Sequence, residues 1–240
     1  MFLPVGDKPN PDNYTPWVNY GLIAVNVLIF GIVSVPLTMQ GSDLSDPSLR
    51  PWIDSILQGN QISVAALQAQ LSAYDVFVAQ HGYTPGTPEI LDIFASLFLH
   101  ANIMHLAGNM LFLWIYGDNV EHRLGRGLYL LTYLLSGVAA ALFFGAMDSQ
   151  SMTPLIGASG AISGVLGLYF FLFPANEVKV LIILFPVFFK AVFFKARWVL
   201  IFYVVVDNLF PMALGGESST AYGAHIGGFF FGLAAGLAAH

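Results

Sequence analysis

The stretch LIGASGAISG, residues 155 to 164, places a single serine between glycines in a strongly apolar chain. Small residues recur here and near the C-terminus at helical intervals, at Gly157, Gly160, Gly164, Gly167, Gly228, Gly232 and Gly236. In lipid, such spacing lets two helix backbones approach closely, because small side chains leave room for direct packing. We therefore expect these two segments to touch. Ser159 is then either a packing residue or a nucleophile.

The composition around this stretch is that of an integral membrane protein. Of the 240 residues, 57% are hydrophobic and only 9% are charged, whereas soluble domains carry about 25% charged residues. The mean hydropathy is +0.72, so lipid is an expected partner. The absence of Cys excludes disulfides and thiolate sites. No basic cluster offers a surface for nucleic acid, which is not expected as a partner.

The apolar segments predict an all-α membrane helix bundle that forms one domain over residues 1–240. A spanning helix needs about 20 apolar residues. Six segments come close to this length: 18–38, 96–117, 127–146, 157–174, 197–212 and 222–239. Residues 178–189 are also apolar but form a shorter run, and Pro186 interrupts them. We interpret them as an interfacial segment, and a seventh span is the alternative.

The basic residues predict the orientation, because Lys and Arg gather in cytoplasmic loops. With a cytoplasmic N-terminus, one basic residue, Arg50, lies outside, and all the others lie inside: Lys8, Arg123, Arg126, Lys179, Lys190, Lys195 and Arg197. We expect a protein of the cell (inner) membrane. Residues 41–92 then form an extracytoplasmic loop. Apolar residues at helical spacing predict one amphipathic helix in this loop, beginning near Ser63 and including Leu67, Leu71, Tyr74 and Val78.

Polar side chains inside spans are costly and therefore mark candidate sites. In the predicted orientation, the second, fourth and sixth spans run inward, and each carries polar residues in its first turns: His100, His105, Asn109, Ser159, Ser163, Tyr222 and His225. His105 and Asn109 are four residues apart and share one helix face. These depths agree, so we expect one cavity that opens to the extracytoplasmic side.

The chemistry that these residues permit is nucleophilic catalysis. A serine needs a base to remove its proton, and histidine is the usual one. Ser159 and His225 are the candidate catalytic pair. Ser159 would begin a helix, whose N–H groups can stabilise an oxyanion, and His105 and Asn109 would add side-chain donors. Asp207 would either orient His225 or be a hydrated carboxylate at a helix end, which we favour.

Structural roles are the alternative for each of these residues. A serine in the surroundings of Ser159, taken alone, is more often a packing residue. His100 is interpreted as an interfacial residue at a helix end. A zinc site built on His100, His105 and His225 is disfavoured, because the first two are five residues apart on one helix and no acid accompanies them. We expect no metal and no cofactor. Glu121 and Arg123 are expected to be solvated or ion-paired structural residues at the inner end of the second span.

Three motifs together resemble one family. FLHANIMHLAGNMLFLWIYGDNVEHRLG (98–125), GASG (157–160) and AHIGGFFFG (224–232) are similar to the hallmark regions of rhomboid intramembrane serine proteases of the prokaryotic six-span type. The resemblance covers the second to sixth spans. It implies that Ser159 is the nucleophile, that His225 is the general base, and that His105 and Asn109 form the oxyanion hole. The implied partners are single-span transmembrane substrates, cleaved within or near the membrane.

One position departs from the family pattern. Some members carry a tyrosine four residues after the nucleophile, where it stacks on the histidine, and this chain has Ser163 there. The orientation of His225 must then be set in another way. By the same resemblance, residues 212–221, which include Gly215 and Gly216, would form a movable cap over the site.

Two other functions remain open from the sequence. The first is a non-catalytic membrane protein that binds or escorts client transmembrane helices, as inactive relatives of the family do. The second is a transporter or channel, for which polar residues would be expected along a whole path. In this chain the polar residues lie only in the outer halves of the predicted spans, which favours the protease.

Overall fold

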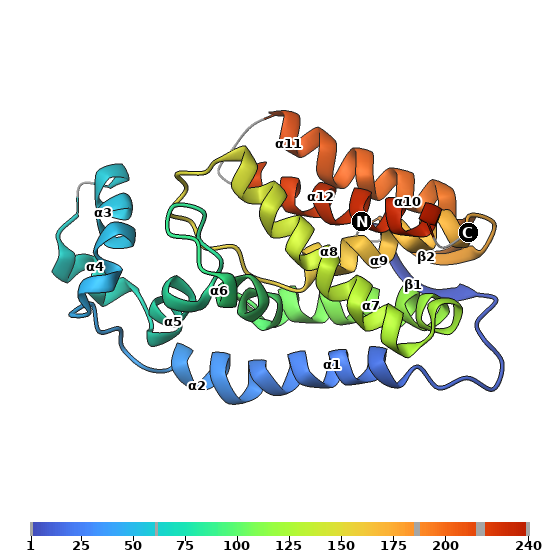
Figure 1. Ribbon diagram of the computed structural model, residues 1–240, viewed down its shortest axis with the longest axis horizontal. Coiled ribbons are helices and arrows are strands. Elements are labelled where there is room, and N and C mark those ends of the chain that lie inside the picture. The colour runs from blue at the N-terminus through green and yellow to red at the C-terminus, as the bar shows by residue number, and fades with distance from the viewer. Residues whose placement is uncertain (1, 61, 185–187, 215–218, 239–240) are drawn as a thin grey trace.

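The computed structural model describes residues 2–60, 62–184, 188–214 and 219–238 and consists mainly of helices that lie side by side (Figure 1). Two long spans agree closely with the prediction. Trp17–Thr38 is one continuous helix made of α1 (Trp17–Ile29), a π-helical turn η1 (Phe30–Ser34) and α2 (Val35–Thr38). The third predicted span is α8 (Arg126–Met147).

Three further helical segments complete the C-terminal half of the bundle. The fifth predicted span consists of α10 (Ala196–Val204), π-helical η4 (Val205–Leu209) and α11 (Phe210–Leu214). The fourth and sixth are α9 (Ser159–Leu172) and α12 (Ser219–Ala238). Within the described residues, three helices have the length and apolarity to cross a membrane, or four if the bent pair described next is one span. The helical membrane bundle is confirmed, whereas the number of six spans stays a prediction.

The second predicted span begins later than expected. Residues 96–102 do not continue the helix: α6 (Ile90–Ala95) and η3 (Ser96–Phe98) are bent by 89° relative to α7 (Ile103–Leu124). The cause is local, since the Asn102 side chain accepts a hydrogen bond from the His105 N–H at 2.9 Å and thereby starts a new helix. At its other end, α7 extends to Leu124, seven residues beyond the predicted end of the span at residue 117.

The glycine-rich segments of α9 and α12 pack directly on each other, as the sequence predicted. A side chain added at Gly232 would overlap the carbonyl oxygen of Gly164, and one at Gly228 would overlap that of Gly160. Close backbone contact of this kind requires glycine at the interface. The α9 helix, buried from Gly160 to Tyr169, is the central element of the bundle, and α7, α8 and α12 contact it.

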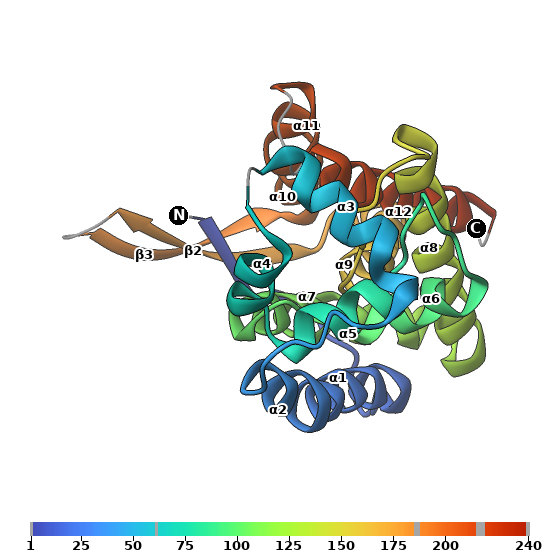
Figure 2. The same ribbon diagram turned by 90° about the vertical axis from the view of Figure 1, so that its left-hand side faces the viewer.

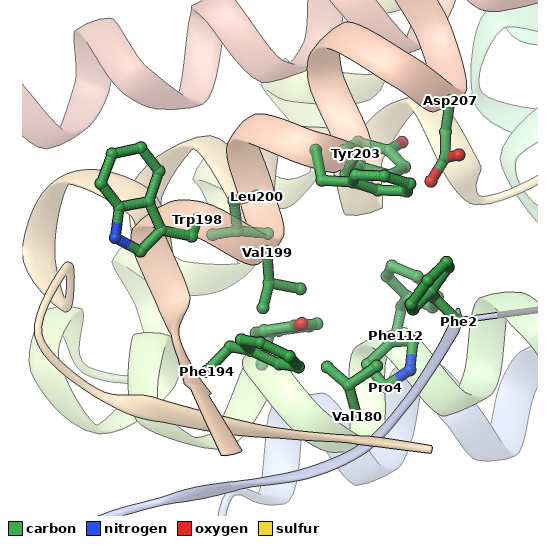
Figure 3. Close-up of a pocket in the computed structure, with 12 residues that line it drawn as sticks. Phe2, Pro4, Phe112, Val180, Phe194, Trp198, Val199, Leu200, Tyr203 and Asp207 are labelled. Atoms are coloured by element: carbon green, nitrogen blue, oxygen red, sulfur yellow. The ribbon is translucent and has the colours of Figure 1, made fainter. Parts of the chain in front are cut away.

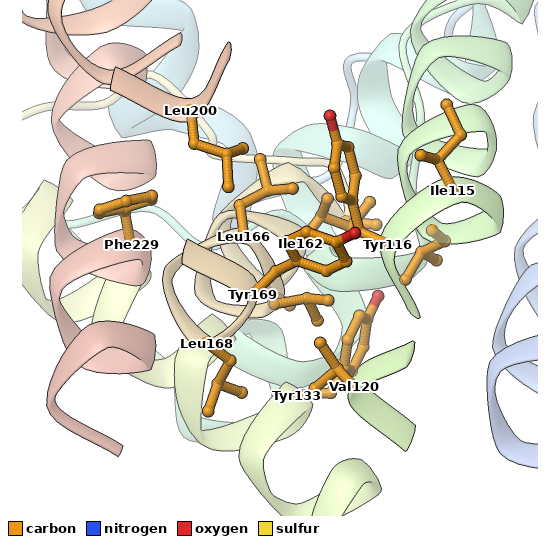
Figure 4. Packing of buried hydrophobic residues seen from close by; sticks show 14 of the residues in the cluster. Ile115, Tyr116, Val120, Tyr133, Ile162, Leu166, Leu168, Tyr169, Leu200 and Phe229 are labelled. Carbon is orange, nitrogen blue, oxygen red and sulfur yellow. The ribbon is translucent and has the colours of Figure 1, made fainter. Parts of the chain in front are cut away.

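Aromatic and aliphatic side chains fill the core between α7 and α9 (Figure 4). Tyr116 and Tyr169 meet edge to face, with their ring centroids 4.9 Å apart. Leu166 and Ile162 fill the space beside these rings, and Phe229 of α12 lies on the other side of α9. Interlocked rings of this size fix the relative position of the helices, because the core leaves little room for sliding.

A three-stranded antiparallel sheet, which the sequence analysis did not predict, is attached at the end of the bundle that we call the sheet end. It contains β1 (Phe2–Lys8), β2 (Glu177–Leu184) and β3 (Phe188–Lys195), in the order β1-β2-β3. Figure 2 shows β2 and β3 extending away from the helices. Residues 178–184 are thus a strand rather than a seventh span. The N-terminal strand β1 pairs with β2, from Phe2 beside Ile182 to Lys8 beside Glu177.

At the opposite end, which we call the loop end, residues 41–92 form a small helical layer (Figure 1). Its helices are a 3-10 turn η2 (Pro47–Leu49), α3 (Arg50–Gly59), α4 (Val64–Gln70) and α5 (Ala73–His81). Ser63 caps α4 as expected. The single predicted helix is divided, however, because Ser72 and Asp75 form a capping box that starts α5. Leu49, Ile53, Leu67 and Val76 form the layer's own core.

Candidate active site

Ser159 and His225 lie side by side, as the sequence predicted. Ser159 is the first residue of α9, and His225 is on α12, the helix that packs against α9 through the glycine interface. His225 Nε2 is 2.8 Å from Ser159 Oγ. This is hydrogen-bonding distance, and it allows a serine hydroxyl to pass its proton to an imidazole.

Asn208 is the residue of the site that the sequence analysis missed. Its Oδ1 is 2.8 Å from His225 Nδ1, and its Nδ2 donates to the Tyr203 carbonyl oxygen at 2.8 Å. Asn208 lies in η4 and is 1% exposed. The available signal was a polar amide inside an apolar span, next to the Asp207 on which the sequence analysis concentrated.

Asp207 does not orient His225. Its side chain is exposed and lines an apolar pocket of about 340 Å³ between α7, α10 and the sheet (Figure 3). Phe112, Trp198 and Phe2 also line this pocket. The favoured interpretation, a solvent-accessible carboxylate rather than a partner of the histidine, agrees with this position. The neighbouring Asn208 occupies the place considered for Asp207.

His105 and Asn109 face the segment that precedes Ser159. A Cβ atom added at Gly157 would lie 2.8 Å from His105 Nε2 and 3.7 Å from Asn109 Nδ2. Gly157 has a φ of 117°, a conformation that side chains rarely adopt. Asn109 is 8% exposed, and its Nδ2 has no hydrogen-bond partner within the described part of the chain. A buried, unpaired donor beside the serine is suited to receive an oxyanion.

The backbone completes this donor set. Helix α9 begins at Ser159, so the Ser159 N–H is one of the first helical N–H groups, which have no acceptor within the helix. The preceding turn is fixed, because the Gly157 N–H donates to the Ser96 carbonyl oxygen at 2.8 Å. The positive end of the helix dipole therefore lies at the serine, where negative charge would develop.

Ser163 and Tyr203 together account for the departure from the family pattern. Ser163 Oγ donates to the Ser159 carbonyl oxygen at 2.8 Å and lies 2.7 Å from the Tyr203 hydroxyl. The hydroxyl of Tyr203, from helix α10, thus reaches position 163, four residues after Ser159. The contacts that hold His225 consequently come from the fifth helical segment rather than from residue 163.

His100 is buried rather than interfacial, so the expectation of a helix-end residue at the membrane surface is wrong. It is 0% exposed and lies in the break before α7. The Tyr74 hydroxyl, from the loop-end layer, donates to its carbonyl oxygen at 2.9 Å and accepts from its N–H at 3.1 Å. Its ring contacts the His105 ring edge-on, with centroids 5.1 Å apart.

The predicted cap, residues 212–221, is described only in part. Helix α11 ends at Leu214 and α12 begins at Ser219. Gly215 and Gly216 lie outside the described residues, so the cap stays a prediction.

Comparisons with known proteins agree with the motifs. The family model described as Rhomboid domain matches residues 87–240. Rhomboid protein 1, mitochondrial, from Saccharomyces cerevisiae is 35% identical over 147 residues, which is 60% of this chain and 40% of the relative. Rhomboid protease GluP from Bacillus subtilis is 33% identical over 147 residues, covering 60% and 26%. Human presenilin-associated rhomboid-like protein, mitochondrial, is 31% identical over 140 residues, covering 58% and 35%. The aligned part is less than half the length of each relative.

Proposed function

The chain belongs to the rhomboid family, and from this premise we propose that it is an intramembrane serine endopeptidase that cleaves single-span transmembrane proteins within or near the membrane. The observation that carries the proposal is the 2.8 Å contact between Ser159 Oγ and His225 Nε2. The relatives named as proteases support it. Structural packing explains Ser159 alone, but it does not explain a histidine aligned on its hydroxyl.

The proposed reaction has two halves. Ser159 Oγ attacks the carbonyl carbon of the scissile peptide bond while its proton moves to His225 Nε2. The tetrahedral oxyanion is stabilised by the donors around Gly157: Asn109 Nδ2, the His105 ring and the Ser159 N–H. His225 then gives its proton to the leaving amine, and the C–N bond breaks to leave an acyl-enzyme. A water molecule, deprotonated by His225, hydrolyses this ester and restores the Ser159 hydroxyl.

The location of the site supports cleavage at the extracytoplasmic side. Ser159 begins α9, and His105 lies in the first turn of α7, toward the loop end of the bundle. The basic residues are concentrated at the other end, which predicts a cytoplasmic N-terminus and sheet end. We therefore propose that the site opens to the extracytoplasmic face of the cell membrane, where water for the second step is available.

The test is cleavage of a single-span substrate by purified protein in detergent. We expect Ser159→Ala and His225→Ala to abolish turnover, because each removes one member of the proton transfer. Ser136→Ala is the matched control: Ser136 is a buried serine whose hydroxyl donates to the Thr132 carbonyl and packs on Gly164, and it should retain cleavage. Full activity of Ser159→Ala would refute the assignment. Binding of substrate without turnover by the wild type would favour the client-binding alternative.

A further inference from the structure

We propose that Asn208 is the positioning residue of this site, which holds His225 in the tautomer and orientation that a general base requires. The inference rests on the proposed protease function and deepens it. Its basis is the continuous chain of contacts from the Tyr203 carbonyl through the Asn208 amide and the His225 ring to the Ser159 hydroxyl.

The hydrogen bonds fix the direction of this chain. An amide nitrogen only donates and a carbonyl oxygen only accepts, so the bond from Asn208 Nδ2 to the Tyr203 carbonyl turns Oδ1 toward the histidine. Oδ1 can only accept, and His225 Nδ1 must therefore carry the proton. In a neutral imidazole the other nitrogen, Nε2, is then unprotonated. Nε2 is the atom 2.8 Å from Ser159 Oγ, and it is ready to accept the hydroxyl proton.

The fold holds Asn208 firmly in this place. Its side chain is 1% exposed. Its amide therefore cannot leave the histidine and bind bulk water unless the contact between η4 and α12 opens. Asn208 lies in a π-helical segment, and such segments interrupt α-helices frequently at functional sites. The neighbouring Tyr203 also reaches Ser163 Oγ, at 2.7 Å. The fifth helical segment thus contacts both the histidine and the helix that carries the nucleophile.

The charged and titratable groups near His225 are few. Among the described residues, His105 of α7 is a titratable side chain near His225. Asp207, adjacent to Asn208 in sequence, is exposed in the apolar pocket and makes no hydrogen bond to the histidine among the described residues. Asn208 itself is neutral. It can therefore orient His225 without adding a negative charge beside it, in contrast to an aspartate at the same position.

A purely structural role is the alternative, and the chain contains a matched example. Asn26 of α1 is also buried in an apolar helix, 0% exposed, and its Nδ2 donates to the Leu22 carbonyl of its own helix at 2.8 Å. Within the part of the chain that the structure describes, no histidine is hydrogen-bonded to Asn26. The two asparagines therefore share the same type of amide-to-backbone bond and differ in the contact to the base.

The experiment compares Asn208→Leu, Asn208→Asp and Asn26→Leu by steady-state cleavage across pH. For Asn208→Leu we expect kcat per folded molecule to fall by about 10²-fold with KM little changed, because a misoriented base affects the chemical step. Asn208→Asp keeps an oxygen that accepts the hydrogen bond from His225 Nδ1, so its kcat should be close to that of the wild type. Its carboxylate favours the imidazolium, so the acidic limb of the kcat/KM profile should move to higher pH. Asn26→Leu should leave kcat per folded molecule and the pH profile unchanged.

The outcomes separate the two proposals. If Asn208→Leu keeps wild-type kcat while Ser159→Ala and His225→Ala are inactive, the protease stands and the positioning role is wrong. If Ser159→Ala remains active, the protease itself is wrong. Should Asn208→Leu not fold, Asn208→Asp decides alone: a shifted acidic limb supports the contact, and an unshifted limb contradicts it.

Discussion

Among the described residues of this apolar bundle, two polar clusters differ in how completely their hydrogen bonds are satisfied. The first surrounds Ser159 and His225 and includes Asn109, whose buried Nδ2 has no partner within the described residues. The second, near the sheet end, surrounds Glu121, which is 0% exposed. Glu121 accepts bonds from the Asn19 N–H at 2.7 Å, the Val18 N–H at 3.3 Å and the Tyr14 hydroxyl at 3.1 Å.

The bonds of the second cluster continue into three helices. Asn19 Nδ2 donates to the Leu113 carbonyl at 2.9 Å, and its Oδ1 accepts from the Tyr129 hydroxyl at 2.8 Å. The basic residue beside Glu121 is Arg126, at 3.9 Å, so Glu121 is ion-paired as expected, whereas Arg123 is exposed. Among the described residues, none of the buried polar side-chain atoms of Glu121, Asn19 and Tyr129 lacks a hydrogen-bond partner, and this saturated network fastens α1, α7 and α8 together.

Under the proposed function, the second cluster stabilises the fold and the first performs chemistry. Both clusters consist of residues that are costly in a membrane, so residue type alone does not distinguish them. An unpaired buried donor destabilises the protein and is of use when a transient charge forms beside it. Mutations in the second cluster should therefore affect stability, and mutations in the first should affect turnover.

The largest effect is expected for Glu121→Ala. It leaves two backbone N–H groups and the Tyr14 hydroxyl without their acceptor, and we expect a loss of about 3 to 5 kcal/mol in the free energy of unfolding. The molecules that remain folded should cleave at the wild-type rate. Thermal unfolding in detergent, followed together with turnover per folded molecule, checks both parts. Arg126→Ala is the control and should cost at most about 1 kcal/mol, because its side chain is 56% exposed.

Asn109→Leu should show the reverse behaviour. Loss of one oxyanion donor raises the transition-state barrier by about 2.7 to 4 kcal/mol, which corresponds to a fall in kcat of about 10²- to 10³-fold. Stability should change little, since Nδ2 forms no bond in the resting site. Asn19→Leu, in the saturated cluster, is the matched control and should lose stability instead. A variant at Asn109 that unfolds easily but turns over normally would reverse the assignment of the two clusters.

The smallest effect concerns Asp7 of β1, beside the saturated cluster. Asp7 accepts hydrogen bonds from Tyr169 and, at 3.0 Å, from Asn119 Nδ2, but burial still raises its pKa from 3.8 to about 7. The native state then holds a proton that the unfolded chain has released, so Asp7 costs stability as the pH rises from about 4 to 7. Asp7→Asn removes this ionisation while keeping an acceptor. The melting temperature of Asp7→Asn relative to the wild type should increase between about pH 4 and pH 7 and stay constant at higher pH. A gain independent of pH would contradict this.

Most of the bundle was predictable, because the span signal is local. The segments 18–38 and 127–146 differ from the observed helices by one residue at their ends. The juxtaposition of Ser159 with His225 followed from glycine spacing, which reports which helices touch. The division between α4 and α5 had a readable signal, since Ser72 and Asp75 have the spacing of a capping box.

The missed features depend on contacts between distant segments. The sheet forms because β1, at the start of the chain, pairs with residues near position 180, and the apolar run 178–189 lacks an alternation that would indicate a strand. Asn208 meets His225 because η4 contacts α12. The π-helical turn that contains Asn208 has no signature in the residue pattern. The sequence therefore indicated the Ser159–His225 contact more readily than the contact between Asn208 and His225.

The central claim is that the Ser159 hydroxyl is activated by His225. Its most direct test is the reaction of the purified protein with a serine-directed fluorophosphonate, analysed by intact mass and peptide mapping. We predict one adduct, on Ser159, which is lost in His225→Ala and forms at the wild-type rate in Arg126→Ala. An adduct on another serine, or equal labelling of Ser159 when His225 is absent, would contradict the account.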